Sequence, residues 1–166
     1  MPDRIYIQAF ESISAVGFNQ DLVKQLFSCT PTALSWQETF AHRPLWYGRI
    51  DDSKLLRDKQ IFTLFPALKN IQNNLGRSQR LIATCLQRLQ PTLQDTIDRY
   101  GPERIAVILG ASVSGMTEME RIFHNNDQLN QFTDQVLEIE NPARFISLAL
   151  KLYGPSYVIS VSYTHL

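Results

Sequence analysis

Short apolar runs alternate along the chain with longer stretches of helical periodicity. Residues 105–109 form a β-branched apolar run of the length typical of a fully buried strand. Similar runs lie near both ends, so we predict core strands at about residues 4–10, 104–110 and 156–161. Long helical crossovers between such strands place them parallel to one another. The pattern therefore predicts an α/β fold built in layers, with mostly parallel core strands.

Two helices are indicated by their 3.6-residue period. Over residues 77–100 the apolar positions fall on one face, and they are Leu81, Ile82, Cys85, Leu86, Leu89, Leu93 and Ile97. We expect Pro91 to kink or restart this helix. A second helix is expected to take Asn141 as its cap and Pro142 at its first position, and to end at Gly154. We interpret both apolar faces as core packing.

The first half of the chain is less regular. Asn19 is a preferred cap for a helix over about residues 20–27, with Leu22, Val23, Leu26 and Phe27 on its apolar face. Between residues 30 and 74 the periodicity breaks down, and only residues 46–50 are typical of a short edge strand. Irregular segments of this length are commonly functional or contact another subunit.

Composition and charge exclude several classes of protein. The 166 residues are 44% hydrophobic and 19% charged, which is ordinary for a globular domain. Sixteen basic and sixteen acidic residues cancel, so the chain has no electrostatic signature for nucleic acid or an anionic membrane. No apolar stretch has the length of a membrane span, and no signal peptide precedes the first strand. We therefore expect a cytoplasmic protein.

The turn over residues 110–115 nearly matches three functional motifs. Gly110 and Gly115 have the spacing of a phosphate loop, but Met116 replaces the lysine that binds the phosphates. Ser112 replaces the middle glycine of a dinucleotide fingerprint, and Gly115 falls one residue late for a nucleophile elbow. A tight turn that lets a helix pack near a sheet fits better than any of these sites. A nucleotide-binding protein that uses this turn stays open as an alternative.

Other chemically interesting residues have structural interpretations. Cys29 and Cys85 are the only thiols, and we interpret both as small buried hydrophobes. His42 and His124 have no partners at metal-ligand spacing, so we predict no metal site and no cofactor. Asp51 and Asp52 are typical of turn chemistry rather than of an acid–base pair. Arg77, Arg80 and Arg88 form a loose basic face, which we interpret as solvated.

An ordered set of segments resembles the β-ketoacyl-acyl-carrier-protein synthases, which have the thiolase fold. Residues 104–118 are similar to their second core strand and the turn after it, and residues 141–145 with 152–160 resemble the helix and third strand that lead to the active site. Residues 5–7, 14–17 and 21–23 are similar to the opening strand, loop and first helix. The closest resemblance is to the branch associated with aryl-polyene and related polyketide-like pathways. It implies the N-terminal part of a thiolase-like layered fold.

The end of the chain departs from this family. The nucleophilic cysteine would fall near Tyr163, and the family's later histidines and lysine would lie beyond Leu166. Residues 161–166 resemble the translation of a sequencing adapter, so we expect an incomplete domain over residues 1–160 and a non-native tail over 161–166. A tyrosine cannot form the acyl thioester that the mechanism needs. We therefore predict no catalytic residue and no condensing activity in this chain.

The resemblance also implies site residues and partners. Ser112 and Val113 match positions at the acyl pocket, although Val113 fits core packing equally well. Ser156, Tyr157, Val158, Ile159 and Ser160 match the strand that pairs across the two-fold axis of the family's dimers. The parent would condense an acyl thioester with malonyl carrier protein in fatty-acid or polyketide-type synthesis. Its partners would be acyl carrier protein and either an identical chain or a related synthase subunit. A non-catalytic subunit resembling a chain length factor remains an alternative.

Overall fold

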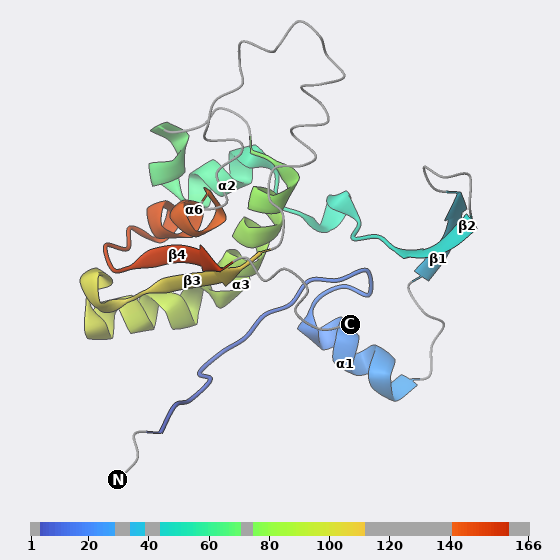
Figure 1. Cartoon of the computed structure of the whole chain (residues 1–166), viewed down its shortest axis with the longest axis horizontal. Coiled ribbons are helices and arrows are strands. Elements are labelled where there is room, and N and C mark those ends of the chain that lie inside the picture. Colours follow the sequence, from blue (N-terminus) through green and yellow to red (C-terminus); the bar gives the residue numbers. More distant parts are fainter. Residues whose placement is uncertain (1–3, 29–33, 39–43, 71–74, 112–140, 160–166) are drawn as a thin grey trace, which may run out of the picture. The chain divides into compact units, whose positions relative to one another are not determined.

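The computed structural model describes residues 4–28, 34–38, 44–70, 75–111 and 141–159 (Figure 1). The chain divides into two units, Met1–Leu55 and Leu56–Leu166. Both helices and strands occur, and a small parallel sheet lies in the second unit. The predicted mixed α/β class is therefore confirmed.

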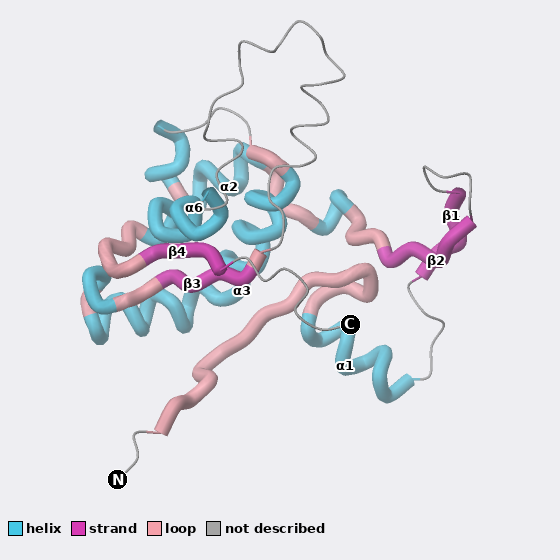
Figure 2. The backbone as a smooth tube through the Cα atoms, in the orientation of Figure 1, coloured by secondary structure: helices cyan, strands magenta, loops and turns pink. Residues whose placement is uncertain are grey.

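The first unit begins with a stretch that corrects one prediction. Residues 4–10 form no strand, and they run as irregular backbone (Figure 2). Their apolar side chains are exposed, with Ile5 at 97% and Ile7 at 85%. A strand exists only where its backbone N–H and C=O groups find ladder partners. Among the described residues no strand pairs with this stretch, so its apolar pattern alone does not produce a strand.

A tight turn then leads into α1, Asn19–Ser28. Ser14 and Gly17 exchange two backbone hydrogen bonds of 2.9 and 3.0 Å, and Gly17 has a φ of 131°. The Asn19 side chain does not cap the helix in the expected way, because it accepts from the Ser12 hydroxyl and donates to the Phe10 carbonyl. The backbone N–H of Asn19 donates instead to Glu11 Oε1 at 3.4 Å.

The irregular region contains a hairpin that the sequence predicted only in part. Strands β1, Leu34–Glu38, and β2, Pro44–Gly48, pair antiparallel, so the strand predicted over residues 46–50 begins two residues earlier. Trp36 lies opposite Trp46, and their rings meet edge to face with centroids 5.4 Å apart. Aromatic pairs on one face are a common way to stabilise two strands.

The second unit contains helices as well as its sheet (Figure 1). Helix α2 spans Asp58–Leu64, and α3 spans Arg77–Tyr100, as predicted. Pro91 does not interrupt α3, which is continuous through it. Leu86 of α3 packs with Ile61 and Phe65 and with Phe145 of α6, Asn141–Leu150. The apolar stripe of α3 is therefore core packing.

The parallel sheet consists of β3, Val107–Gly110, and β4, Ser156–Ile159 (Figure 1). The predicted strand over residues 104–110 begins later, because residues 102–104 form a 3₁₀ turn. Helix α6 packs against both strands. Val107, Ala143 and Leu152 are buried together there, with Leu109 and Val158 packed against them.

Helix α6 ends earlier than predicted. Lys151 has a φ of 54°, and the N–H of Leu152 donates to the carbonyl of Ser147 at 2.8 Å. The N–H of Lys151 donates to the carbonyl of Leu148 at 3.3 Å, which completes a Schellman motif. Lysine thus occupies the left-handed position where glycine is usual, and Gly154 lies beyond the end of the helix.

Candidate functional site

The carboxyl edge of the β3–β4 sheet is the place where the sequence predicts ligand chemistry. There the N–H of Ala111 donates to the carbonyl of Ile159 at 3.2 Å, the ladder bond nearest this edge among the described residues. Within the described ranges, a Cβ built on Gly110 would meet no atom within 4 Å apart from its two chain neighbours, so this part of the chain leaves the backbone open at this edge. Ligands of parallel α/β sheets bind outside the carboxyl ends of the strands. The carboxyl ends of β3 and β4 therefore lie side by side, at a position where a ligand could bind.

The structure describes some of the predicted site residues and not others. Ser112 and Val113 follow Ala111 directly in the sequence but lie outside the described residues, as do Ser160 and Tyr163. Ser156, Tyr157, Val158 and Ile159 form β4. The described ranges contain no cluster of three or more His, Cys, Asp or Glu side chains that could hold a metal ion.

The opposite, amino-terminal edge of the sheet fixes how the strands align. The N–H of Val107 donates to the carbonyl of Pro155 at 2.8 Å, and the N–H of Tyr153 donates to the carbonyl of Pro102 at 3.1 Å. Gly154 lies between these two bonds, and a Cβ there would be 2.2 Å from the carbonyl oxygen of Ile105. Only glycine permits this approach of two backbones. This close approach of the Gly154 and Ile105 backbones sets the register that brings Ala111 and Ile159 together at the carboxyl edge.

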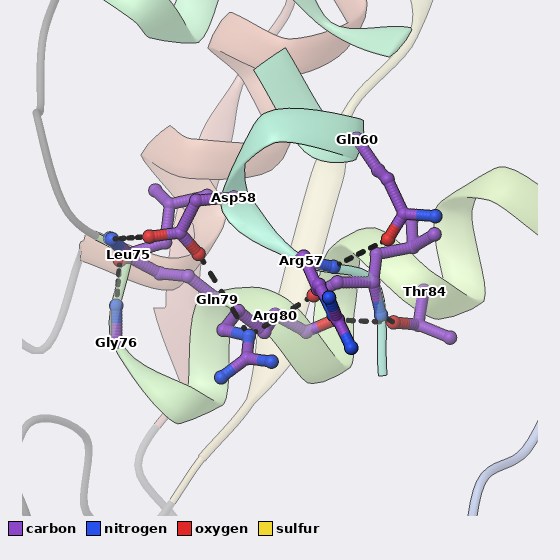
Figure 3. Close-up of polar contacts among 9 residues, drawn as sticks. Arg57, Asp58, Gln60, Leu75, Gly76, Gln79, Arg80 and Thr84 are labelled. Carbon is purple, nitrogen blue, oxygen red and sulfur yellow. Dashed lines mark hydrogen bonds and ion pairs between the residues drawn. The ribbon is translucent and has the colours of Figure 1, made fainter. Parts of the chain in front are cut away.

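A polar network joins the start of α2 to α3 (Figure 3). The Thr84 hydroxyl accepts from the N–H of Leu56 at 3.1 Å and donates to the carbonyl of Arg80 at 2.7 Å. Arg80 Nε donates to the carbonyl of Leu56 at 3.0 Å and lies 3.9 Å from Asp58 Oδ1. Asp58 Oδ2 accepts from the N–H of Leu75 at 3.3 Å. Sequence reasoning missed this network, since Thr84 and Asp58 belong to no motif.

This network changes the interpretation of the basic face on α3. Arg80 is about a quarter exposed and binds the backbone and carboxylate of its own chain. Arg80 therefore has a structural role, which differs from the solvated face that the sequence suggested.

Two glutamines occupy the same position at the starts of α2 and α3. Gln60 Oε1 accepts from the N–H of Arg57, and Gln79 Oε1 accepts from the N–H of Gly76, each at 2.9 Å. These two hydrogen bonds anchor the starts of the helices.

The remaining candidate residues have structural surroundings or are not described. Asp51 accepts from the N–H of Ser53 at 2.9 Å, and this hydrogen bond holds the pKa of the Asp51 carboxyl below its usual value. Its role is that of a turn cap, as predicted. Cys85 is half-buried on α3. Cys29, His42 and His124 lie outside the described residues.

The fold is that of the ketosynthases. The chain resembles a chain in the solved structure of the ketosynthase ApeO in complex with its chain length factor ApeC from Xenorhabdus doucetiae, with a TM-score of 0.70 and 24% sequence identity. The similarity covers 93% of this chain and 39% of that chain. No protein-family model and no curated protein matches the sequence. Among the described residues, no helix is long and apolar enough to cross a membrane.

Proposed function

We propose that the chain is part of a β-ketoacyl-acyl-carrier-protein synthase subunit. The observation that carries this proposal is the ketosynthase fold over 93% of the chain. The parent would perform the decarboxylative condensation of an acyl thioester with malonyl carrier protein, in fatty-acid or polyketide-type synthesis. Ser112 and Val113 would line the acyl pocket, since they follow β3 at the open carboxyl edge of the sheet. In the same proposal the parent protein is cytoplasmic and has an acyl carrier protein as a partner.

The 166-residue chain itself has no condensing activity in this proposal. The mechanism needs a thiolate activated at a helix N-terminus, and Tyr163 stands near the position of the family's cysteine. The test is to incubate the purified chain with acyl carrier protein that carries a radiolabelled acyl group. No hydroxylamine-sensitive label should transfer to the chain. A stoichiometric acyl thioester on this chain would contradict the proposal.

The second candidate is a non-catalytic subunit that resembles a chain length factor. It is favoured by one observation, which is that the similar structure is a ketosynthase bound to its chain length factor. The two candidates differ at a single place in the gene. Sequencing the source DNA through codon 160 and beyond would show a cysteine codon near position 163 for a catalytic parent. A reading frame that continues without this cysteine supports the partner subunit.

We also propose that β4 pairs with another subunit across a two-fold axis. β3 is the one strand among the described residues that pairs with β4, so the other edge of β4 is available. Unpaired edges readily accept another strand. Sedimentation velocity of the purified chain over a range of concentrations tests this proposal. A species that stays monomeric throughout would contradict self-association through this edge.

A further inference from the structure

One face of the β1–β2 hairpin gathers large apolar side chains. Leu34 and Trp36 are two residues apart in β1, so they point to the same side of the sheet. The register Trp36↔Trp46 adds the Trp46 side chain from β2, and the edge-to-face contact of the two rings agrees with this placement. We call Leu34, Trp36 and Trp46 the tryptophan face of the hairpin.

The tryptophan face is covered at one end and exposed beyond it. A Cβ built on Gly48 would lie 3.2 Å from Leu34 Cδ2 and 3.4 Å from the Cβ of Ala15, so the turn before α1 lies against the Leu34 end. Trp36, in contrast, is 56% exposed, and Trp46 is 63% exposed. Tryptophan side chains are highly buried on average in folded proteins. Two tryptophans as exposed as these therefore indicate a surface on which further polypeptide packs.

We infer that the tryptophan face is covered by the polypeptide that follows residue 160 in the parent subunit. This inference rests on the proposed function, in which the chain is one part of a longer synthase subunit. The similarity to the solved structure covers 39% of that chain, so more than half of that chain has no counterpart here. The parent therefore has a large length of its own polypeptide with which to cover the hairpin. A hairpin of two strands is marginally stable alone, so it also needs such packing.

The area of the tryptophan face favours this occupant over a separate protein. An aromatic side chain presents about 150–250 Å², and each of the three side chains is about half exposed, so the open area is a few hundred Å². A stable interface between two proteins buries about 800 Å² on each partner. Association of separate molecules also costs translational and rotational freedom, and a segment of the same polypeptide does not lose that freedom. The size of the face therefore fits an intramolecular contact.

The fluorescence of this chain gives the first test. Trp36 and Trp46 are the only tryptophans among the 166 residues, so the emission reports on this face alone. We expect the dilute chain to emit at the long wavelength of solvent-exposed tryptophan and to be quenched readily by acrylamide. The variants Trp36→Phe and Trp46→Phe each leave one reporter. Emission that is protected from the quencher in dilute solution, or that becomes protected as the concentration rises, would overturn the inference, because the 166 residues or a second copy would then cover the face.

The deciding measurement compares this chain with the full-length parent, expressed from the re-sequenced gene. Hydroxyl-radical footprinting read by mass spectrometry gives the oxidation rates of Trp36 and Trp46 in their own peptides, whatever tryptophans lie further along the parent. The same peptides in urea-denatured protein give the rates at full exposure. We expect both rates to fall severalfold in the isolated parent subunit. Unchanged rates would overturn the inference, and so would protection that arises only when a partner subunit is added.

Condensing activity of the same preparation separates this inference from the proposed function. An active parent whose tryptophans oxidise as fast as in the 166-residue chain would overturn the inference and leave the proposed function standing. An inactive parent with protected tryptophans would uphold the inference and contradict a catalytic role for the parent.

Discussion

Gly154 and Ile105 approach so closely that a Cβ on residue 154 would lie 2.2 Å from the Ile105 carbonyl oxygen. Gly154→Ala must push the two backbones apart at the amino-terminal edge of the β3–β4 sheet. We expect a loss of about 1–3 kcal/mol in the free energy of unfolding, as for an overpacked core. Urea denaturation followed by circular dichroism measures it.

Gly110→Ala is the matched control for that substitution. It adds the same methyl group to the same sheet, but in the part of the chain that the structure describes no atom beyond its two chain neighbours lies within 4 Å of that methyl group. We expect a change smaller than about 0.5 kcal/mol, as at ordinary surface positions. Equal effects of the two substitutions would show that the close approach at Gly154 does not determine stability.

Thr84→Val should destabilise the second unit because it leaves the backbone N–H of Leu56 without an acceptor. Thr84 is 3% exposed, and valine keeps its shape but cannot accept from the N–H of Leu56. An unsatisfied buried donor costs about 1–3 kcal/mol. Thr96→Val is the control, because the Thr96 hydroxyl only donates to the Thr92 carbonyl within the same helix. Thermal unfolding of both variants should show a clear loss for Thr84→Val and little change for Thr96→Val.

Lys151→Gly should stabilise the end of α6. A side chain at φ 54° is strained, and glycine adopts this conformation without that penalty. We expect a gain of about 0.5–1 kcal/mol, reduced by the greater freedom of glycine in the unfolded chain. Lys151→Ala removes the same charge but keeps the Cβ, so it should not stabilise the protein. If both substitutions stabilise equally in chemical denaturation, the charge rather than the backbone is responsible.

The Asp51 carboxyl should titrate below its ordinary value of 3.8. The backbone hydrogen bond from Ser53 is the largest cause, followed by the Ser53 side chain. Because the folded pKa is depressed, this hydrogen bond stabilises the fold above the unfolded pKa, and its contribution disappears as the pH falls through the folded pKa. NMR titration of the Asp51 side-chain carbon measures the midpoint. Ser53→Ala should raise it only in part, since the backbone N–H remains.

The sequence correctly predicted the elements whose buried side chains recur at a regular spacing. Helix α3 has the predicted bounds because its apolar stripe has a strict helical period and Gly101 follows its last residue. Residues 4–10 show the limit of such patterns, since a strand also needs partners that local sequence does not specify. Helix α2 was missed because it is only seven residues long and too short to show a period.

The sequence predicted the position of the candidate site, but it did not predict the backbone contact that aligns the two strands. The small-residue turn after residue 110 directs attention to the carboxyl edge of the sheet, which follows from the α/β order alone. Gly154 was predicted to end a helix, because a glycine after a helical pattern usually has that role. Its close approach to Ile105 depends on a residue almost fifty positions earlier, a relation that no local pattern contains.

The separation of β3 from β4 along the chain has a consequence during synthesis on the ribosome. Val107 pairs with Ser156, and translation at about 5–20 residues per second leaves several seconds between the two strands. Throughout this interval β3 is a nascent strand whose hydrogen-bonding partner has not yet been made. Ile108 and its neighbours are then substrates for chaperones or for aggregation with other nascent chains, so cellular yield should depend on translation speed between these codons.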